Sequence, residues 1–369
     1  MKKLLIITNS SGGLYNFRKN LLESLTEVCD VYVASGFDKK MEHLEKLGLH
    51  LTSLTIDRRG MNVFSEVYLL FQILKCLVRI RPDYVITYTI KPNIYGGLLS
   101  HMLHIPYAAN ITGLGTAFQN DNLIKRIIII LYKAALKKAK VVFFENSGNQ
   151  AIFLDNKIVN NYQACLLNGA GVDLDKFQYS MYPASSSPFV FLFVGRVMRE
   201  KGIEELFSAT KRLINDGYSV QLNIVGACEE NYTDSLEQFE SEGWLNYYGY
   251  CDDVIPYIHN CNCFVLPSYH EGMANTNLEA ASSGRPLITS DIPGCREAVI
   301  NGVSGLLCQS KDTESLYSSM KKMYLMSDYE RENMGVEGRM HMEMHFDKNV
   351  VVKQTIAALG LRESIDSGE

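Results

Sequence analysis

The most informative absences in this sequence concern membrane spans and metal sites. None of its apolar runs approaches the roughly 18 residues that a membrane-spanning helix needs. Its nine cysteines form no CxxC pair, and its eight histidines show no metal-ligand spacing. Internal repeats and low-complexity tracts are also missing. These absences predict a cytoplasmic protein with reduced, structural thiols and no bound metal ion.

The length and the charge distribution indicate two domains of different character. The 369 residues exceed what one hydrophobic core usually organises, about 100 to 200 residues. Residues 1–180 contain 21 Lys and Arg against 14 Asp and Glu, whereas residues 181–369 contain 15 against 27. The basic first half indicates an anionic partner for that half alone, and no nucleic-acid partner is expected.

Short β-branched or apolar runs alternate with longer amphipathic stretches, which predicts parallel sheets covered by helices. A Ser/Pro-rich stretch over 178–188 interrupts the alternation and is typical of a linker. We predict an α/β fold with Rossmann-like domains over 1–177 and 189–345, whose sheets face across a ligand-binding cleft. A C-terminal helix over about 346–360 is expected to pack back on the first domain. The predicted strands are 4–8, 30–34, 84–88, 140–145, 189–195, 220–226, 263–268 and 286–291.

Two glycines follow the first predicted strand in "NSSGGLYNFRKNL" (9–21). Gly12 and Gly13 are expected to let the backbone turn tightly, so that the following helix presents free amides and its positive dipole end to an anion. The pattern is not GxGxxG, so a dinucleotide site is not supported. A plain strand-to-helix turn is the alternative.

A second glycine-containing segment, "VGRVMREKGIEEL" (194–206), carries positive charge. A strand is predicted to end at Gly195, and Arg196 and Lys201 flank a helix that starts near Gly202. The planar fork of arginine and the mobile ammonium of lysine suit a diphosphate. Ordinary surface charges are the alternative, but cations at a helix start oppose the helix dipole and need another reason.

The third segment, "YHEGMANTNLEAASSGRPLITS" (269–290), holds two glutamates eight residues apart. If a helix begins within it, Glu279 lies about one turn inside and Glu271 lies in the loop just before. Carboxylates accept hydrogen bonds from sugar hydroxyls, and the backbone amides between the glutamates suit a partial negative charge. With Arg196 and Lys201, these residues predict a nucleotide-sugar site. The amides are those of Gly272, Met273, Ala274 and Asn275.

These segments, together with "GRPLITSDIPGCREAV", "NGVSGLL" and "GVDLDKF", resemble the family 4 glycosyltransferases over nearly the whole chain. That family consists of retaining enzymes of the GT-B architecture. The resemblance implies that Glu271 contacts the donor sugar, Glu279 contacts the ribose, and Arg196 and Lys201 bind the diphosphate. It also implies that the donor is a substrate and that no cofactor or metal is required.

Three segments carry a closer resemblance: "YTIKPNIYG", "ANITGLGTAF" and "EGMANTNLEA". They resemble segments of bacterial transferases that add N-acetylgalactosamine or a related sugar to undecaprenyl-diphosphate-linked acceptors. The resemblance makes UDP-N-acetylgalactosamine the expected donor. Many family members have a histidine after the fifth strand, where this chain has Asn110 and Thr112, so a histidine-centred role is in doubt. The expected acceptor or sugar contacts are Lys91, Asn110, Thr112 and His270.

A basic stripe is predicted in "NLIKRIIIILYKAALKKAK" (122–140). On one helix, Arg126, Lys133, Lys137 and Lys140 fall in a narrow angular range beside a packed apolar run, which is typical of contact with an anionic membrane surface. A helix packed on the sheet with a basic solvent face is the alternative. We expect a peripheral protein on the inner face of the cytoplasmic membrane.

Three alternatives are weighed against this interpretation. A metal site is the first alternative, because Asp173 and Asp175 match the metal-binding DxD motif. They lie, however, in the segment that resembles the end of the family's first domain. A UDP-sugar epimerase of the same shape would need acid and base groups over the sugar ring, and the first domain offers too few of them to favour it. A non-catalytic sugar-nucleotide-binding protein would keep the same contacts and stays open.

Overall fold

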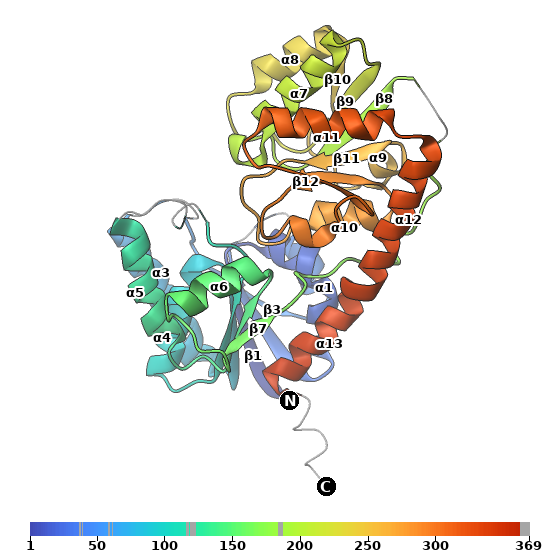
Figure 1. The fold of residues 1–369 in the computed structure, drawn as a ribbon. Coiled ribbons are helices and arrows are strands. Elements are labelled where there is room, and N and C mark those ends of the chain that lie inside the picture. The colour runs from blue at the N-terminus through green and yellow to red at the C-terminus, as the bar shows by residue number, and fades with distance from the viewer. Residues whose placement is uncertain are drawn as a thin grey trace. The chain divides into compact units, whose positions relative to one another are not determined.

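The computed structural model describes residues 1–36, 38, 40–57, 60, 62–115, 118, 123–183 and 187–361. The chain divides into two compact units (Figure 1). Unit 1 comprises Met1–Ala170 and Asn349–Glu369, and unit 2 comprises Gly171–Lys348. Each unit is a parallel sheet flanked by helices, so the predicted α/β fold with two Rossmann-like domains is confirmed.

Among the described residues, unit 1 contains a seven-stranded parallel sheet in the order β3-β2-β1-β4-β5-β6-β7. Alternate residues of β1 enter different hydrophobic clusters, because successive side chains of a strand point to opposite faces. Leu5 and Ile7 join the cluster that includes α3, whereas Leu4 and Ile6 join the cluster that includes α1 and α13. The strands are β1 (Lys2–Thr8), β2 (Cys29–Ser35), β3 (His50–Ser53), β4 (Tyr84–Tyr88), β5 (Tyr107–Ile111), β6 (Val141–Phe144) and β7 (Ala164–Leu166). The helices are α1 (Ser11–Thr26), α2 (Met41–Glu45), α3 (Val63–Ile80), α4 (Ile90–Met102), α5 (Leu123–Leu136), α6 (Ser147–Asp155) and α13 (Lys348–Leu359).

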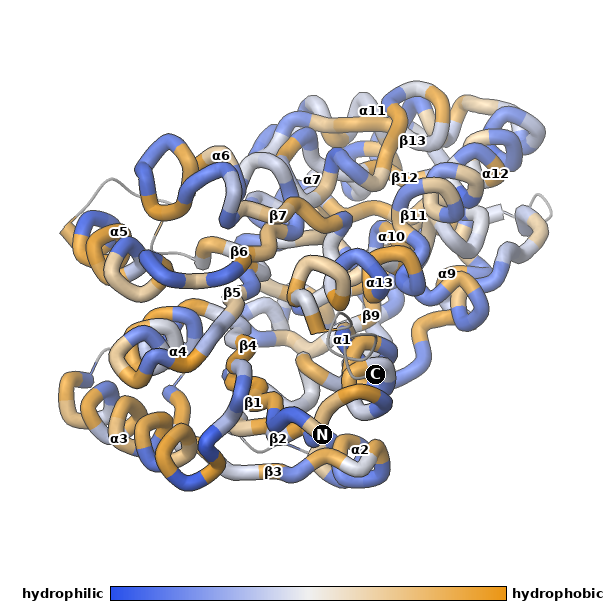
Figure 2. The backbone as a smooth tube through the Cα atoms, turned by 90° about the horizontal axis from the view of Figure 1, so that it is seen from below, coloured by the Kyte–Doolittle hydropathy of each residue, from blue (hydrophilic) through white to orange (hydrophobic). Residues whose placement is uncertain are grey.

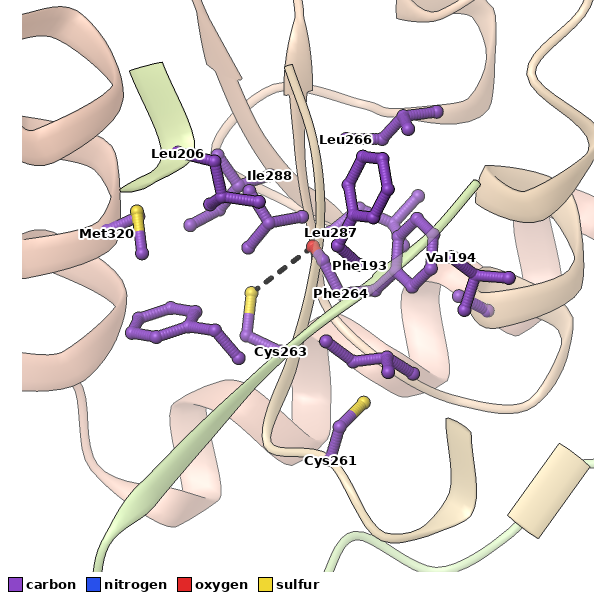
Figure 3. Packing of buried hydrophobic residues seen from close by; sticks show 14 of the residues in the cluster. Phe193, Val194, Leu206, Cys261, Cys263, Phe264, Leu266, Leu287, Ile288 and Met320 are labelled. Atoms are coloured by element: carbon purple, nitrogen blue, oxygen red, sulfur yellow. Dashed lines mark hydrogen bonds between the residues drawn. The ribbon is translucent and has the colours of Figure 1, made fainter. Parts of the chain in front are cut away.

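The described part of unit 2 contains a six-stranded parallel sheet in the order β10-β9-β8-β11-β12-β13. Its core includes Cys261 and Cys263, which pack among apolar side chains of the central strands (Figure 3). Burial raises the pKa of the Cys261 thiol to about 12, as expected for a structural thiol. The strands are β8 (Phe189–Val194), β9 (Val220–Val225), β10 (Leu245–Tyr247), β11 (Cys263–Leu266), β12 (Leu287–Ser290) and β13 (Gly305–Cys308). The helices are η2 (Arg199–Lys201), α7 (Ile203–Asn215), α8 (Thr233–Ser241), α9 (Ile255–His259), α10 (Asn275–Ser282), η3 (Arg296–Ala298), α11 (Thr313–Leu325) and α12 (Asp328–His345).

Residues 180–182 of the segment predicted as a linker, 178–188, are hydrogen-bonded to unit 2. The Ser180 amide donates to the Ser283 carbonyl (3.2 Å), and the Tyr182 hydroxyl donates to the Asn262 carbonyl (3.0 Å). The guanidinium of Arg285, which is fully buried, donates to the Met181 carbonyl (2.9 Å). The division between the units therefore lies at Gly171, and residues 184–186 lie outside the described part of the chain.

Candidate functional site

The segment after β8 is held against the segment after β11 by a close backbone approach. Gly202 has a φ of 72°, and a Cβ atom there would lie 2.1 Å from the Pro267 carbonyl oxygen. Only glycine fits both the left-handed conformation and the contact. The Tyr269 amide donates to the Glu200 carbonyl (2.8 Å) and so joins the same segments.

This contact brings Lys201 and Glu271 together. The Lys201 ammonium forms an ion pair with Glu271 Oε1, and the Ser268 hydroxyl donates to the same oxygen (2.8 Å). Both charged side chains are largely buried, so their attraction is less screened than that of a surface pair. We call Lys201, Ser268 and Glu271 the cation–carboxylate cluster. The cluster offers an ammonium and a carboxylate at one place.

Tyr269 anchors the turn that carries this cluster. Its hydroxyl donates to the carboxylate of Glu205 on α7, with distances of 2.7 Å and 2.8 Å to the two oxygens. Lys311 lies over the tyrosine ring, 5.0 Å from its centroid. The neighbouring residue His270 is exposed overall, but partial desolvation of its imidazole, together with the charge of nearby Lys311, lowers its pKa. Neutral His270 can therefore donate and accept one hydrogen bond each at neutral pH.

α10 begins at Asn275, which places Glu271 in the preceding loop and Glu279 within the second turn, as predicted. The N-cap residue Ala274 makes no side-chain capping bond. Two of the four amides predicted to be free have protein acceptors. The Ala274 amide donates to the Gly294 carbonyl (2.7 Å) and the Asn275 amide to the Met273 carbonyl (3.0 Å). Those two amides are therefore not open to a ligand in this structure, which corrects the prediction.

The Glu279 carboxylate differs from that of Glu271, because no described residue gives it a hydrogen bond or an ion pair. Burial raises the pKa of Glu279 to about 7, and the positive charge of Lys176 opposes the rise only in part. A half-buried carboxyl of raised pKa without a partner is a candidate for contact with ligand hydroxyls.

Glu297, which the sequence patterns did not single out, supports the loop before α10. Its carboxylate accepts the Gly294 amide (2.7 Å), and the Gly294 carbonyl accepts the Ala274 amide. Gly294 has a φ of 89°, and a Cβ there would lie 2.8 Å from the Glu271 carbonyl oxygen. His341 of α12 contacts the Glu297 carbonyl oxygen through Nε2 (2.8 Å). Glu297 thereby fixes the backbone that positions Glu271.

Arg196 forms its ion pair with a carboxylate outside the cation–carboxylate cluster. Its guanidinium donates to Glu229 Oε2 (2.9 Å), and half of its side chain remains exposed. The preceding Gly195 donates its amide to the Val225 carbonyl (2.9 Å), which leaves that amide unavailable to a ligand. An exposed ion pair of this kind contributes little to stability, so Arg196 can exchange Glu229 for another anion at small cost.

In unit 1, Gly12 and Gly13 lie inside α1 rather than in a turn before it. Neither has a positive φ, so the expected tight turn is wrong. The Gly12 amide donates to Asp38 Oδ2 (2.8 Å) and the Gly13 amide to the Ser10 hydroxyl (3.2 Å). The N-terminus of α1 already has an acidic partner, and an anionic ligand would have to displace Asp38.

The predicted acceptor contacts of unit 1 lie at the carboxyl ends of β4 and β5. Asn110 is buried in β5 and its side chain donates to the Thr87 carbonyl (3.5 Å), whereas Thr112, just after β5, is partly exposed. The Lys91 ammonium donates to the carbonyls of Asp57 (2.6 Å) and Gly60 (2.8 Å). It also forms an ion pair with Glu66. The three donors of the Lys91 ammonium are therefore in use within unit 1.

The basic stripe predicted on a single helix is only partly helical. α5 ends at Leu136, so Arg126 and Lys133 lie on it, Lys137 follows in a turn, and Lys140 directly precedes β6. All four side chains are exposed. In the part of the chain that is described, no helix is long and apolar enough to cross a membrane.

Within the same described residues, no group of three or more His, Cys, Asp or Glu side chains is arranged to hold a metal ion. Asp173 Oδ2 accepts the Lys348 ammonium (3.0 Å), and its Oδ1 accepts the Lys176 amide (2.9 Å). Burial raises the pKa of the Asp173 carboxyl, but these hydrogen bonds outweigh burial and hold the pKa below its usual value. Asp173 is thus occupied in joining the two ends of unit 2.

Comparison with known proteins assigns each half of the chain to related families. Residues 180–341 match the family model of glycosyl transferases group 1, and residues 3–146 match that of glycosyl transferase 4-like proteins. These two matches agree with the division of the chain into two units.

Two curated relatives span nearly the full length. The N,N'-diacetylbacillosaminyl-diphospho-undecaprenol alpha-1,3-N-acetylgalactosaminyltransferase of Campylobacter jejuni is 27% identical over 94% of this chain and 96% of its own. The capsular polysaccharide biosynthesis glycosyltransferase CapM of Staphylococcus aureus is 24% identical over 87% of each chain.

Among solved structures, HepE of Anabaena in complex with UDP and glucose superposes with a TM-score of 0.79. The superposition covers 98% of this chain and 100% of HepE, at 16% identity. At that identity the likeness shows the fold alone.

Proposed function

Because this chain belongs to the group 1 glycosyltransferases, we propose that it transfers N-acetylgalactosamine from UDP-N-acetylgalactosamine to a lipid-diphosphate-linked saccharide, with retention of configuration. The proposed reaction site is supported above all by the cation–carboxylate cluster of Lys201, Ser268 and Glu271 in unit 2. The full-length relative in Campylobacter supports the sugar and the acceptor class.

The charges of unit 2 suit the two ends of a nucleotide sugar. The Lys201 ammonium faces the donor diphosphate, and Arg196 leaves Glu229 to join it. Glu271 accepts hydroxyls of the donor sugar and Glu279 accepts hydroxyls of the ribose. The loop of Gly272 and Met273, between Glu271 and α10, lies beside the sugar or the phosphate in this proposal. Fixed cations that meet the charge developing on a leaving group make one of the largest contributions to catalysis.

The transfer needs no protein base in this scheme. The bond between the anomeric carbon and the diphosphate oxygen breaks, and the acceptor hydroxyl oxygen bonds to that carbon on the same face. The departing phosphate oxygen takes the proton of the acceptor hydroxyl, so UDP and the new glycoside are the products. Glu271 and Lys201 orient the donor and stabilise the leaving charge rather than accept the proton.

The acceptor side belongs to unit 1 in this proposal. Asn110 and Thr112 of unit 1 remain candidates to contact the acceptor, and His270 of unit 2 remains a candidate to contact the donor sugar. Lys91 is assigned to the structure of unit 1 because its donors are in use. The exposed basic residues Arg126, Lys133, Lys137 and Lys140 would attract an anionic membrane surface that holds the acceptor lipid.

Incubating the protein with UDP-N-acetylgalactosamine, UDP-galactose or UDP-N-acetylglucosamine and a synthetic lipid-diphosphate sugar tests the proposal. A new α-glycoside formed fastest from UDP-N-acetylgalactosamine supports it. An epimerised nucleotide sugar, or binding without a product, contradicts it and supports one of the alternatives. Activity is expected to persist in EDTA, since cations of the chain face the diphosphate; loss that manganese restores would contradict the metal-free scheme.

A further inference from the structure

The helix α3 exposes an apolar face that no described residue of unit 1 covers. Its inward residues Leu69, Ile73 and Leu77 are buried in the sheet-facing cluster. A helix that packs on a sheet normally turns polar residues outward, but α3 is apolar over most of its turns (Figure 2). Phe64 is 86% exposed and Phe71 is 61% exposed. The outward apolar residues are Val63, Phe64, Val67, Tyr68, Phe71 and Val78.

The spacing of these residues makes them one stripe. Phe64, Val67 or Tyr68, Phe71 and Val78 recur at intervals of three, four and seven residues, which places them on one side of a helix of 3.6 residues per turn. Lys75 and Arg79, both exposed, lie along the same side. We call this set the α3 outer face: an apolar surface with basic residues at one end.

Specific contacts hold the first turns of α3 in place. Glu66 receives the Lys91 ammonium on one oxygen and the Tyr95 hydroxyl on the other (2.7 Å). The Gln72 side chain accepts the Thr55 amide (2.9 Å). The inward face of α3 is therefore fixed by both apolar packing and hydrogen bonds, and its outer face stays exposed on a rigid support.

These contacts also locate the α3 outer face. Lys91 lies in the first turn of α4, directly after β4 ends at Tyr88, so the start of α3 lies near the carboxyl ends of the central strands. Asn110 near the end of β5 and Thr112 just after it lie at the same edge. α4 also packs against α5, whose outward residues Leu123, Ile127 and Ile130 are exposed. Apolar surface thus flanks the edge of the sheet proposed for the acceptor.

The charge of the two helices selects the partner. Residues 63–80 and 123–140 contain eight Lys and Arg but only one acidic residue, Glu66, which Lys91 and Tyr95 already bind. A second copy of the chain that docks through this same face would bring like charges together. An anionic lipid surface takes up apolar side chains and attracts basic ones.

We propose that the α3 outer face enters the headgroup and upper acyl region of an anionic bilayer, and that it brings the acceptor edge of unit 1 to the membrane surface. The identity of the acceptor rests on the proposed function, but the membrane contact does not. In this account, α3 supplies apolar insertion and the residues around α5 supply electrostatic attraction. Binding therefore depends on both lipid charge and the aromatic side chains of α3.

A tryptophan reporter tests the insertion in the full chain. The one natural tryptophan, Trp244, is buried in unit 2. Phe64→Trp is expected to shift its emission to the blue, and to be quenched by brominated acyl chains, on vesicles of phosphatidylethanolamine and phosphatidylglycerol. The matched control is Tyr329→Trp, at a 72% exposed position of α12, which should show neither change. Equal quenching of the two reporters, or none at Phe64→Trp, would overturn the proposal.

A polar substitution separates this inference from the proposed function. Phe64→Ser with Phe71→Ser is expected to weaken vesicle binding by about tenfold or more, because each buried phenylalanine favours the apolar phase by at least that factor. The double variant should lose turnover on a lipid-held acceptor and keep it on a short water-soluble analogue. Undiminished vesicle binding, or loss of a dimer in its place, would contradict the inference. Absence of transfer to the soluble analogue by the unmodified chain would instead contradict the proposed function.

Discussion

The two units share one architecture but differ in the charge that occupies the loop after their first strand. In unit 1, the helix after β1 starts with amides that donate to Asp38 and Ser10. In unit 2, Lys201 in the segment after β8 forms an ion pair with Glu271, which lies in the loop just before α10. The N-cap residue of α10 makes no side-chain capping bond. The amides after β1 are therefore occupied by Asp38 and Ser10 of the same unit. The segment after β8 instead carries a lysine that a phosphate can share with Glu271.

In the proposed function, the local placement of charged side chains, rather than the net charge of a unit, decides where the anionic donor binds. Unit 2 contains 14 Lys and Arg against 26 Asp and Glu, so its overall charge repels a nucleotide sugar. Its site nevertheless has a largely buried ammonium, whose interactions are screened less than those of the surface acids. The basic unit 1 is suited instead to an extended anionic surface.

The largest effect is expected from removing the cations of unit 2. Lys201→Ala should lower kcat by about 10²- to 10³-fold, because the leaving diphosphate loses its fixed positive charge. Arg196→Ala should lower it by a similar order. Turnover measured on folded protein checks both. Lys211→Ala, which removes an exposed partner of Glu242, is the matched control and should stay near the unmodified rate. Near-normal turnover of both site variants would break the comparison.

A smaller loss is expected from Glu297, which acts by positioning. Glu297→Ala removes the acceptor of the Gly294 amide and loosens the loop that carries Glu271, so kcat/KM should fall by about thirtyfold. Glu297→Gln keeps an oxygen at that place and should restore activity to within about threefold. If alanine and glutamine behave alike while both proteins unfold at the same temperature, Glu297 has no positioning role.

The raised pKa of Glu279 predicts a pH dependence of donor affinity. In the proposed site, ribose hydroxyls donate to the ionised carboxylate, so donor binding requires loss of the proton that Glu279 holds below its pKa of about 7. Affinity for a UDP-sugar should therefore rise about tenfold between about pH 6 and pH 8, because the ionised fraction rises by that factor. Calorimetric titration measures it. Glu279→Gln should bind more weakly and lose the dependence; a dependence kept in that variant assigns it to another group.

The same shift affects folding in the opposite direction. A carboxyl whose pKa is higher in the folded state stabilises the fold below its unfolded pKa, and that contribution is lost as the pH rises through the folded pKa. Ligand-free protein should therefore lose some stability from mildly acidic to neutral pH, and Glu279→Gln should lose less of it.

The smallest effect is expected in unit 1. Asp38→Ala frees the Gly12 amide, yet donor kinetics should stay within about twofold, because the proposed donor site lies in unit 2. Thermal unfolding should show a loss of about 1 kcal/mol from the missing partner of the helix start. A rise of tenfold or more in donor affinity would mean that Asp38 was blocking a true anion site at α1.

Sequence patterns predicted the strongly apolar strands well, for simple physical reasons. β1, β2, β4, β8 and β9 appear within one or two residues of the predicted ranges, because continuous β-branched runs are typical of buried parallel strands. Five strands were not singled out: β3, β5, β7, β10 and β13. Four of them have only three or four residues, which give no clear period, and β5 has five.

For the candidate site, the spacing of Glu271 and Glu279 around a helix start was correct. The pairing of Lys201 with Glu271 and the bond from Gly294 to Glu297 join segments far apart in the chain, which a local pattern does not reveal. The acid that closes α1, Asp38, comes from the segment after β2 for the same reason. The end of α5 at Leu136 also escaped the pattern, because the basic period continues beyond the helix.

The central claim is that the donor binds to unit 2 at the cation–carboxylate cluster and the start of α10. Hydrogen–deuterium exchange of the full chain, with and without saturating UDP-N-acetylgalactosamine, tests it most directly. The account predicts slower exchange over 196–202 and 268–279, with the first turn of α1 unchanged. Slower exchange at the first turn of α1, with 196–202 and 268–279 unaffected, would contradict it.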